Sequence, residues 1–172
     1  MKNIKAIIFD LGGIFLNISY QKTINEFTKL GIKNSSSFYC KESQNNLFDL
    51  FEIGGISEHD FISKIKNKCD SASANEVRFA WNAMLLDFQK KSIELLTSLK
   101  KRHLIFLLSN TNTIHLKEFK KILGVNQYNK FINLFNHVYY SHEIGLRKPN
   151  KEAFQIILEE NSLTAKNVLF VD

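Results

Sequence analysis

Residues 4–15 read IKAIIFDLGGIF, an apolar run that ends at a carboxylate with two glycines close behind. A strand that is buried on both faces of a parallel sheet has such a continuous apolar run, so the stretch predicts a central strand ending at Asp10. Open α/β sheets bind ligands at the carboxyl ends of their strands. Taken alone, Asp10 could equally be a turn residue or the N-cap of a helix.

Two later apolar runs also end at polar side chains. Residues 104–108 (LIFLL) are followed by Ser109 and Asn110, and residues 167–171 (NVLFV) are followed by Asp172. Because the carboxyl ends of parallel strands lie on one edge of a sheet, we expect these side chains to gather there with the carboxylate of the first strand.

The gathered residue types suit phosphoryl transfer. Asp10 can act as the nucleophile that becomes an aspartyl-phosphate, and Ser109 can hold phosphate oxygens. Lys148, directly before the only proline of the chain, can neutralise phosphate charge. Asp10, Asp172 and a main-chain carbonyl of the first turn offer the oxygen ligands that Mg²⁺ prefers. Each residue also has an ordinary explanation: Ser109 as a helix cap, Lys148 as one lysine of many and Asp172 as a carboxylate at the chain end.

Two kinds of pattern divide the chain. Residues from about 20 to 86 have helical spacing, whereas from residue 88 helices and strands alternate. We therefore expect an α/β fold with a parallel sheet formed by 1–18 and 88–172, and a helical insertion at 19–87. Ser57 is expected to cap a helix, and the proline at position 149 is expected to start another.

Composition excludes several classes of protein. The 172 residues are 44% hydrophobic, which argues against disorder, and Cys40 and Cys69 fit a reduced intracellular protein better than a disulfide scaffold or a zinc site. Asp10 interrupts the apolar stretch near the start, and no run is long enough to span a membrane. The net charge of +6 is compatible with nucleic-acid binding, but the lysines are spread over several expected helices, where they more simply form solvated helix faces. We expect a cytoplasmic protein that binds neither nucleic acid nor membrane.

Four segments resemble the motifs of the haloacid dehalogenase-like (HAD) hydrolase superfamily. Residues 9–14 (FDLGGI) resemble its first motif, 108–112 (LSNTN) its second, 147–149 (RKP) its third and 169–172 (LFVD) the start of its fourth. The helical stretch resembles the type 1 cap. Within the superfamily the chain is most similar to the sugar-phosphate phosphatase branch that includes α-D-glucose-1-phosphate phosphatase, and more distantly to the phosphatase domain of soluble epoxide hydrolase. The resemblance implies a Rossmann-like core with strand order near 3-2-1-4-5.

The resemblance also implies roles for the matching residues in phosphate and substrate binding. Ser109 and Asn110 would bind phosphate, and Lys148 would bind phosphate and orient the nucleophile. A loop of the cap around Gly54 and Gly55 would help to select the substrate, a small phosphorylated metabolite.

The implied metal site departs from the family pattern in two ways. Asp10 would be the nucleophile and a Mg²⁺ ligand, and Gly12 would bind the metal through its carbonyl. Phosphatases of the superfamily usually have an aspartate at the position of Gly12, as general acid and base; its loss costs about 10²–10⁴-fold in rate. Asp172 would be the first of two acidic ligands, but the chain ends there. The second ligand and the C-terminal part of the core would then be missing.

Three hypotheses for the function follow. The leading one is a Mg²⁺-dependent phosphatase, acting as a monomer or weak homodimer. The second is a metal-independent haloacid dehalogenase, which EDTA would leave active. The third is a catalytically silent protein that binds phosphorylated metabolites, which the glycine at position 12 favours.

Overall fold

The computed structural model describes residues 3–39 and 46–172, so Cys40 lies outside the described residues, and Cys69 is a free thiol. Its described part centres on a four-stranded parallel sheet in the order β5-β4-β1-β6. The strands are β1 (Ala6–Phe9), β4 (Leu104–Ser109), β5 (His137–Tyr140) and β6 (Val168–Val171). Numbered along the chain within this sheet, the order is 3-2-1-4. The α/β prediction with a parallel sheet is confirmed.

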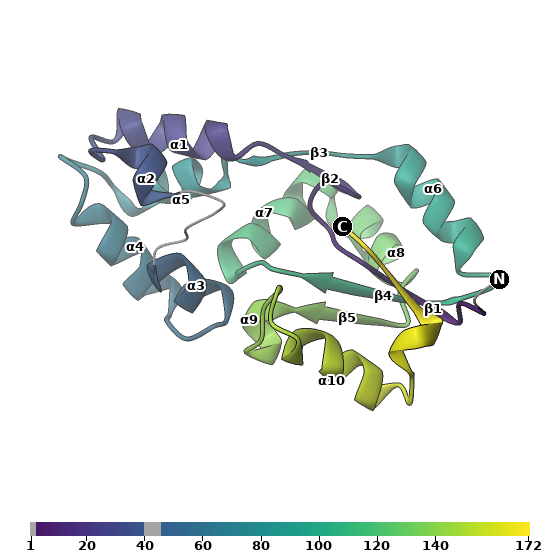
Figure 1. The fold of residues 1–172 in the computed structure, drawn as a ribbon. Coiled ribbons are helices and arrows are strands. Elements are labelled where there is room, and N and C mark those ends of the chain that lie inside the picture. The colour runs from purple at the N-terminus through teal and green to yellow at the C-terminus, as the bar shows by residue number, and fades with distance from the viewer. Residues whose placement is uncertain (1–2, 40–45) are drawn as a thin grey trace.

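Helices connect the successive strands of the sheet, as Figure 1 shows. In chain order they are α1 (Tyr20–Lys29), α2 (Ser35–Phe38), α3 (Asn46–Glu52), α4 (Glu58–Lys66), α5 (Ala74–Asn82), α6 (Lys90–Leu99), α7 (Thr113–Leu123), α8 (Val125–Ile132), α9 (Ser141–Ile144) and α10 (Glu152–Glu160), with a 3₁₀ turn at Ala165–Asn167. In the described stretches, no helix has both the length and the apolar character that crossing a membrane requires.

The central strand is apolar throughout because both faces of the sheet are covered. Ile7 and Phe9 of β1 point into a core closed by α6, α7 and α8, whereas Ala6 and Ile8 point into a core closed by α10. All four residues of β1 are buried. Alternate side chains of a strand face opposite sides, so the continuous apolar run read from the sequence is the signature of this double burial.

Helices α1–α5 form a separate cluster, called here the helical insertion. It lies beyond the carboxyl ends of β4 and β5 (Figure 1) and packs around Trp81, which is 1% exposed. Phe48 and Phe27 stack on the indole ring, and Tyr39 meets it edge-on. These aromatic contacts give the insertion a hydrophobic core of its own.

A short antiparallel ribbon joins the insertion to the sheet. Its strands are β2 (Leu16–Ile18) and β3 (Leu85–Phe88). The sequence did not predict this ribbon, because strands of three and four residues are too short for an alternating pattern to stand out. The limits of the two expected domains, 1–18 with 88–172 and 19–87, therefore stay predictions.

The two expected helix starts had different outcomes. Ser57 caps α4 as predicted, since its hydroxyl accepts a hydrogen bond from the backbone N–H of Asp60 at 3.1 Å. The prediction that Pro149 starts a helix is wrong, because α10 begins at Glu152. Pro149 instead follows a cis peptide bond in the loop that carries Lys148.

Candidate active site

Asp10 lies directly after β1, where the strand gives way to a tight turn. Its backbone N–H donates to the carbonyl of Val171 at 2.9 Å, which continues the β1–β6 ladder to the edge of the sheet. Its Oδ1 accepts from the N–H of Leu11 at 2.7 Å. Gly13 has φ of +81°, a value that side chains other than hydrogen disfavour, so glycine is required for the turn at this position.

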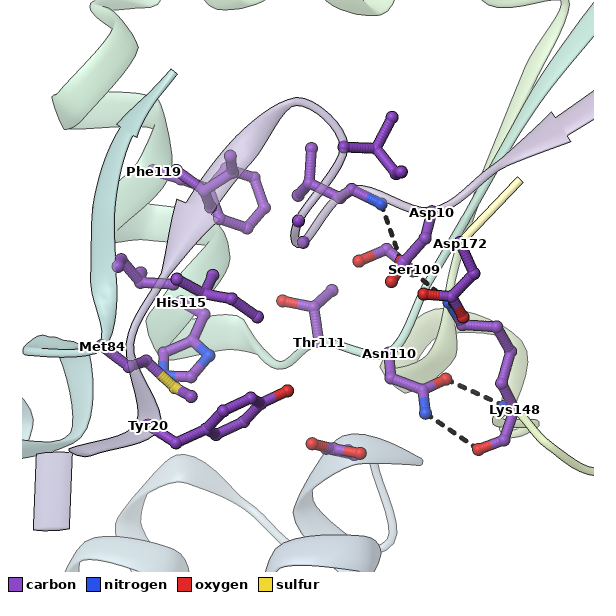
Figure 2. Close-up of a pocket in the computed structure, with 18 of the residues that line it drawn as sticks. Asp10, Tyr20, Met84, Ser109, Asn110, Thr111, His115, Phe119, Lys148 and Asp172 are labelled. Carbon is purple, nitrogen blue, oxygen red and sulfur yellow. Dashed lines mark hydrogen bonds and ion pairs between the residues drawn. The ribbon is translucent and has the colours of Figure 1, made fainter. Parts of the chain in front are cut away.

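Lys148 is the cation that faces this carboxylate. Its Nζ lies 2.9 Å from Oδ1 of Asp10 and 3.5 Å from Oδ2 of Asp172, and the lysine is 8% exposed (Figure 2). Burial raises the pKa of Asp10 above its usual value, and Lys148 opposes that rise without cancelling it. Asp10 and Asp172 thus lie at one edge of the sheet as predicted, and Lys148 joins them from its loop.

The backbone of Lys148 is held by Asn110. The amide nitrogen Nδ2 of Asn110 donates to the Lys148 carbonyl, and the Lys148 N–H donates to Oδ1 of Asn110, both at 2.9 Å. This paired contact ties the loop after β5 to the carboxyl end of β4. Asn110 therefore positions Lys148, and its predicted contact with phosphate stays a prediction.

A cavity of about 630 Å³ opens above these residues. On the side of the sheet it is lined by residues from the predicted motifs: Asp10, Gly12, Ser109, Asn110, Lys148 and Asp172. The opposite wall comes from the insertion and the ribbon: Ile18, Tyr20, Tyr39, Glu52, Met84 and Leu85. Figure 2 shows Tyr20, Met84 and His115 across the space from Lys148. The cavity therefore has a charged end and a largely aromatic and apolar end.

An ion-pair network connects the two walls. Arg147, next to the site lysine, places Nη2 3.0 Å from Oε2 of Glu52 and Nη1 2.9 Å from Oδ1 of Asp49. Glu52 is 7% exposed, so its charge is held largely out of water. A guanidinium that spans two carboxylates fixes its partners in a defined geometry. The loop carrying Lys148 is thereby tied to α3 of the insertion.

Gly54 and Gly55, the predicted substrate-selecting residues, lie elsewhere. Both are exposed, and among the residues that the structure describes neither lines the cavity. Gly54 has φ of +70° and packs directly on the carbonyl of His142, so a side chain would not fit there. Glu52, two residues earlier, does line the cavity. A role for the glycines in substrate selection stays a prediction.

Sequence reasoning missed His115, which lines the cavity in the first turn of α7. Asn112 caps this helix by accepting from the N–H of His115 at 3.0 Å. A signal was present, because a helix that starts directly after a strand end turns its first residues toward the same edge of the sheet. Tyr20 and Met84 had no such signal, since distant parts of the chain bring them here.

The residues at the charged end fit a magnesium ion. Within the described part of the chain, the hydrogen bond and ion pair of Asp10 both fall on Oδ1, which leaves Oδ2 for a ligand. Asp172 and the carbonyl of Gly12 add oxygen donors beside the same cavity. The described residues contain no cluster of three His, Cys, Asp or Glu side chains, as a protein-only metal cage would need. Mg²⁺ commonly takes one or two carboxylates and completes its shell with water and phosphate.

Comparison with known families agrees with this arrangement. A model of the haloacid dehalogenase-like hydrolases matches residues 4–172. The chain belongs to this hydrolase family. The predicted superfamily and the prediction that the chain is a hydrolase are thus confirmed. The narrower sugar-phosphate branch stays a prediction.

Known HAD proteins resemble the chain over most of its length. A D-ribitol-5-phosphate phosphatase from Bacteroides thetaiotaomicron is 25% identical over 170 residues, covering 98% of this chain and 82% of the relative. A HAD family enzyme from the same organism is 30% identical with a TM-score of 0.84, covering 99% of this chain and 85% of that one. Its wild-type complex with magnesium and inorganic phosphate has 29% identity and a TM-score of 0.81, covering 97% and 83%.

Proposed function

We propose that this HAD hydrolase is a Mg²⁺-dependent phosphatase that cleaves a small phosphorylated sugar or polyol through an aspartyl-phosphate on Asp10. The observation that carries the proposal is the contact of 2.9 Å between Lys148 Nζ and the Asp10 carboxylate at the end of the central strand. The phosphatase activity of the curated relative and the magnesium and phosphate bound by the Bacteroides enzyme support the same chemistry.

The chemistry needs a carboxylate nucleophile and a way to offset phosphate charge. A carboxylate oxygen of Asp10 would attack phosphorus, forming an O–P bond while the ester P–O bond breaks. Lys148 would hold the transferring oxygens and keep Asp10 ionised, against the burial that favours its neutral form. A water molecule would then attack phosphorus, release inorganic phosphate and restore the carboxylate. Mg²⁺, held by Asp10, Asp172 and the carbonyl of Gly12, would neutralise charge on the phosphoryl group.

Gly12 is expected to lower the rate of turnover. The departing alkoxide must take a proton, and a glycine has no side chain to give one. Water in the cavity would supply that proton, so turnover is expected to be slow relative to an enzyme with a general acid here.

The helical insertion is proposed to act as the cap over this site. It supplies the wall opposite the nucleophile, and Arg147 links it to the loop of Lys148. Closure of such a layer excludes water and selects the substrate. In this proposal the cap comprises residues 19–87, and Ser109 contributes to phosphate binding beside Asp10.

The test is phosphate release from a panel of sugar and polyol phosphates, with Mg²⁺ or EDTA. Turnover that requires both Mg²⁺ and Asp10, with Asp10→Asn as the inactive control, is the expected result. Turnover that persists in EDTA contradicts the proposal and favours the dehalogenase-type reading. Calorimetric binding of panel members without any phosphate release contradicts it too, in favour of a binding protein.

A further inference from the structure

His115 is a buried histidine at the end of the cavity away from Lys148. Figure 2 shows its ring on the same side of the cavity as Met84 and Tyr20, and the residue is 7% exposed. The ring stacks on Trp81 with centroids 4.5 Å apart and an interplanar angle of 19°. The position of the imidazole is thus fixed by packing as well as by the capped first turn of α7.

A hydrogen bond sets which ring nitrogen carries the proton. Nε2 lies 3.1 Å from the carbonyl oxygen of Trp81, and a carbonyl can only accept, so Nε2 donates. Burial lowers the pKa of His115 to about 4, so the ring is neutral near pH 7. A neutral imidazole has one N–H, so Nδ1 is an acceptor, and among the residues that the structure describes no hydrogen bond to it is found.

The place of His115 in the cavity indicates what that acceptor would meet. Phosphate would bind beside Asp10 and Lys148, so the rest of a substrate extends toward the opposite end. Most of that end is apolar, with Ile18, Met84 and Leu85 on its wall. Hydroxyl groups entering it would lose their bonds to water and would need partners from the protein. An acceptor-only nitrogen satisfies a hydroxyl but not a carbonyl or an ether oxygen.

We propose that His115 is a specificity-determining residue whose Nδ1 accepts a hydrogen bond from a hydroxyl of the substrate's leaving group. It would select phosphate esters of neutral polyols or sugars over esters that lack hydroxyls. The inference rests on the proposed phosphatase function. It extends that function by naming a residue and the chemical group that this residue recognises.

The experiment compares two esters of similar length, D-ribitol 5-phosphate and n-pentyl phosphate, which has no hydroxyls. In His115→Phe an aromatic ring can still stack on Trp81, and the Trp81 carbonyl keeps a bond from Thr23 at 3.1 Å. We expect the kcat/KM ratio of the two substrates to fall about tenfold, mainly through a higher KM for ribitol 5-phosphate. In His115→Asn a side-chain oxygen can replace Nδ1, so this variant should retain more of the preference.

A second histidine provides the matched control. His103 also places a ring nitrogen near a backbone carbonyl, 3.0 Å from that of Ile4, and it lies beside the opposite end of the sheet. His103→Phe should leave the ratio unchanged. A ratio that is unchanged in His115→Phe overturns the inference alone. A wild-type enzyme that releases no phosphate from either ester in Mg²⁺ overturns the proposed function, and this inference with it.

Discussion

The two ends of the cavity are built by different means. At the charged end, Asp10 and Asp172 each directly follow a strand, and Ser109 is the last residue of one. At the other end, Tyr20 and Met84 come from opposite limits of the helical insertion and meet across the core around Trp81. Parallel strands place the first set on one edge, whereas packing of distant segments places the second.

This contrast suggests a division of labour. The charged end carries the groups that phosphoryl transfer requires, and these depend on the sheet. The opposite side carries His115, hydroxyls and apolar surface, with Glu52 as a carboxylate held by Arg147, and these depend on how the insertion packs. Changes at the first end should alter the rate for every substrate, whereas changes at the second should alter the choice among substrates.

Removal of the nucleophile should have the largest effect. Asp10→Asn keeps the shape of the side chain but cannot form an aspartyl-phosphate, so kcat should fall by at least about 10³-fold for every substrate. Phosphate release measured in Mg²⁺ checks this, with the exposed Asp87→Asn as the control for loss of a carboxylate. Substantial turnover in Asp10→Asn would place the chemistry elsewhere.

A general acid introduced at position 12 should accelerate the reaction at the charged end of the cavity. Gly12 has no positive φ, and a Cβ there would lie 3.1 Å from the flexible Cδ1 of Ile18, so an aspartate fits after a small shift. Gly12→Asp should raise kcat at least about tenfold, because its carboxyl can protonate the leaving group. Gly12→Asn is the matched control, because its side chain has the size of aspartate but no acidic proton to give to the leaving group. Equal rates in the two variants would show that proton transfer does not limit turnover.

The ion pair between Arg147 and Glu52, which connects the two walls of the cavity, should have a large effect on the free energy of unfolding. Arg147→Met leaves the buried Glu52 without its guanidinium, and we expect a loss of about 3 kcal/mol in the free energy of unfolding. Adding Glu52→Gln should recover at least about 1 kcal/mol, since the buried carboxylate that has lost the nearby guanidinium is then neutral. Urea unfolding of the wild type, Arg147→Met, Glu52→Gln and the double variant measures this coupling. Additive losses would mean that the pair does not couple the walls.

The exposed ion pair between the insertion and the core should contribute least. Burial raises the pKa of Glu58, but Lys117 and Arg78 more than offset this and hold it below its usual value of 4.5. A lowered carboxyl pKa stabilises the fold above pH 4.5, and that contribution disappears as the pH falls through the folded-state pKa. Lys117→Met should therefore cost less than about 1 kcal/mol at pH 7, and this cost should shrink as the pH falls below 4.5. Urea midpoints measured from pH 7 downward test this, with the exposed Lys91→Met as control. A cost that does not shrink as the pH falls contradicts it.

The sequence predicted the core better than the insertion for a physical reason. Asp10, Ser109 and Asp172 could be placed because a buried strand has a local signature and its end has a fixed place in a parallel sheet. The amide of Asn110 bonds the backbone of Lys148, a contact between residues 38 apart that no local pattern encodes, while its predicted contact with phosphate stays a prediction.

Residues of the insertion were harder to assign. The sequence pointed to the loop around Gly54 and Gly55, whereas Glu52, the last residue of α3, is the one that lines the cavity. Glycine in a turn looks the same in sequence whether it admits a ligand or packs on a neighbouring carbonyl, as Gly54 does on His142. The start of α7 close behind a strand indicates that His115 lies near the edge of the sheet, but its stacking on Trp81, 34 residues away, follows from no local pattern.

The most direct test of the division of labour is a comparison of kcat/KM for D-ribitol 5-phosphate and n-pentyl phosphate in Mg²⁺. Lys148→Met, read against the exposed Lys151→Met, should lower both values by the same factor of about 10²–10³. His115→Phe should lower only the value for ribitol 5-phosphate. A Lys148→Met variant that changes the preference between the two esters, or a His115→Phe variant that lowers both equally, would contradict the account.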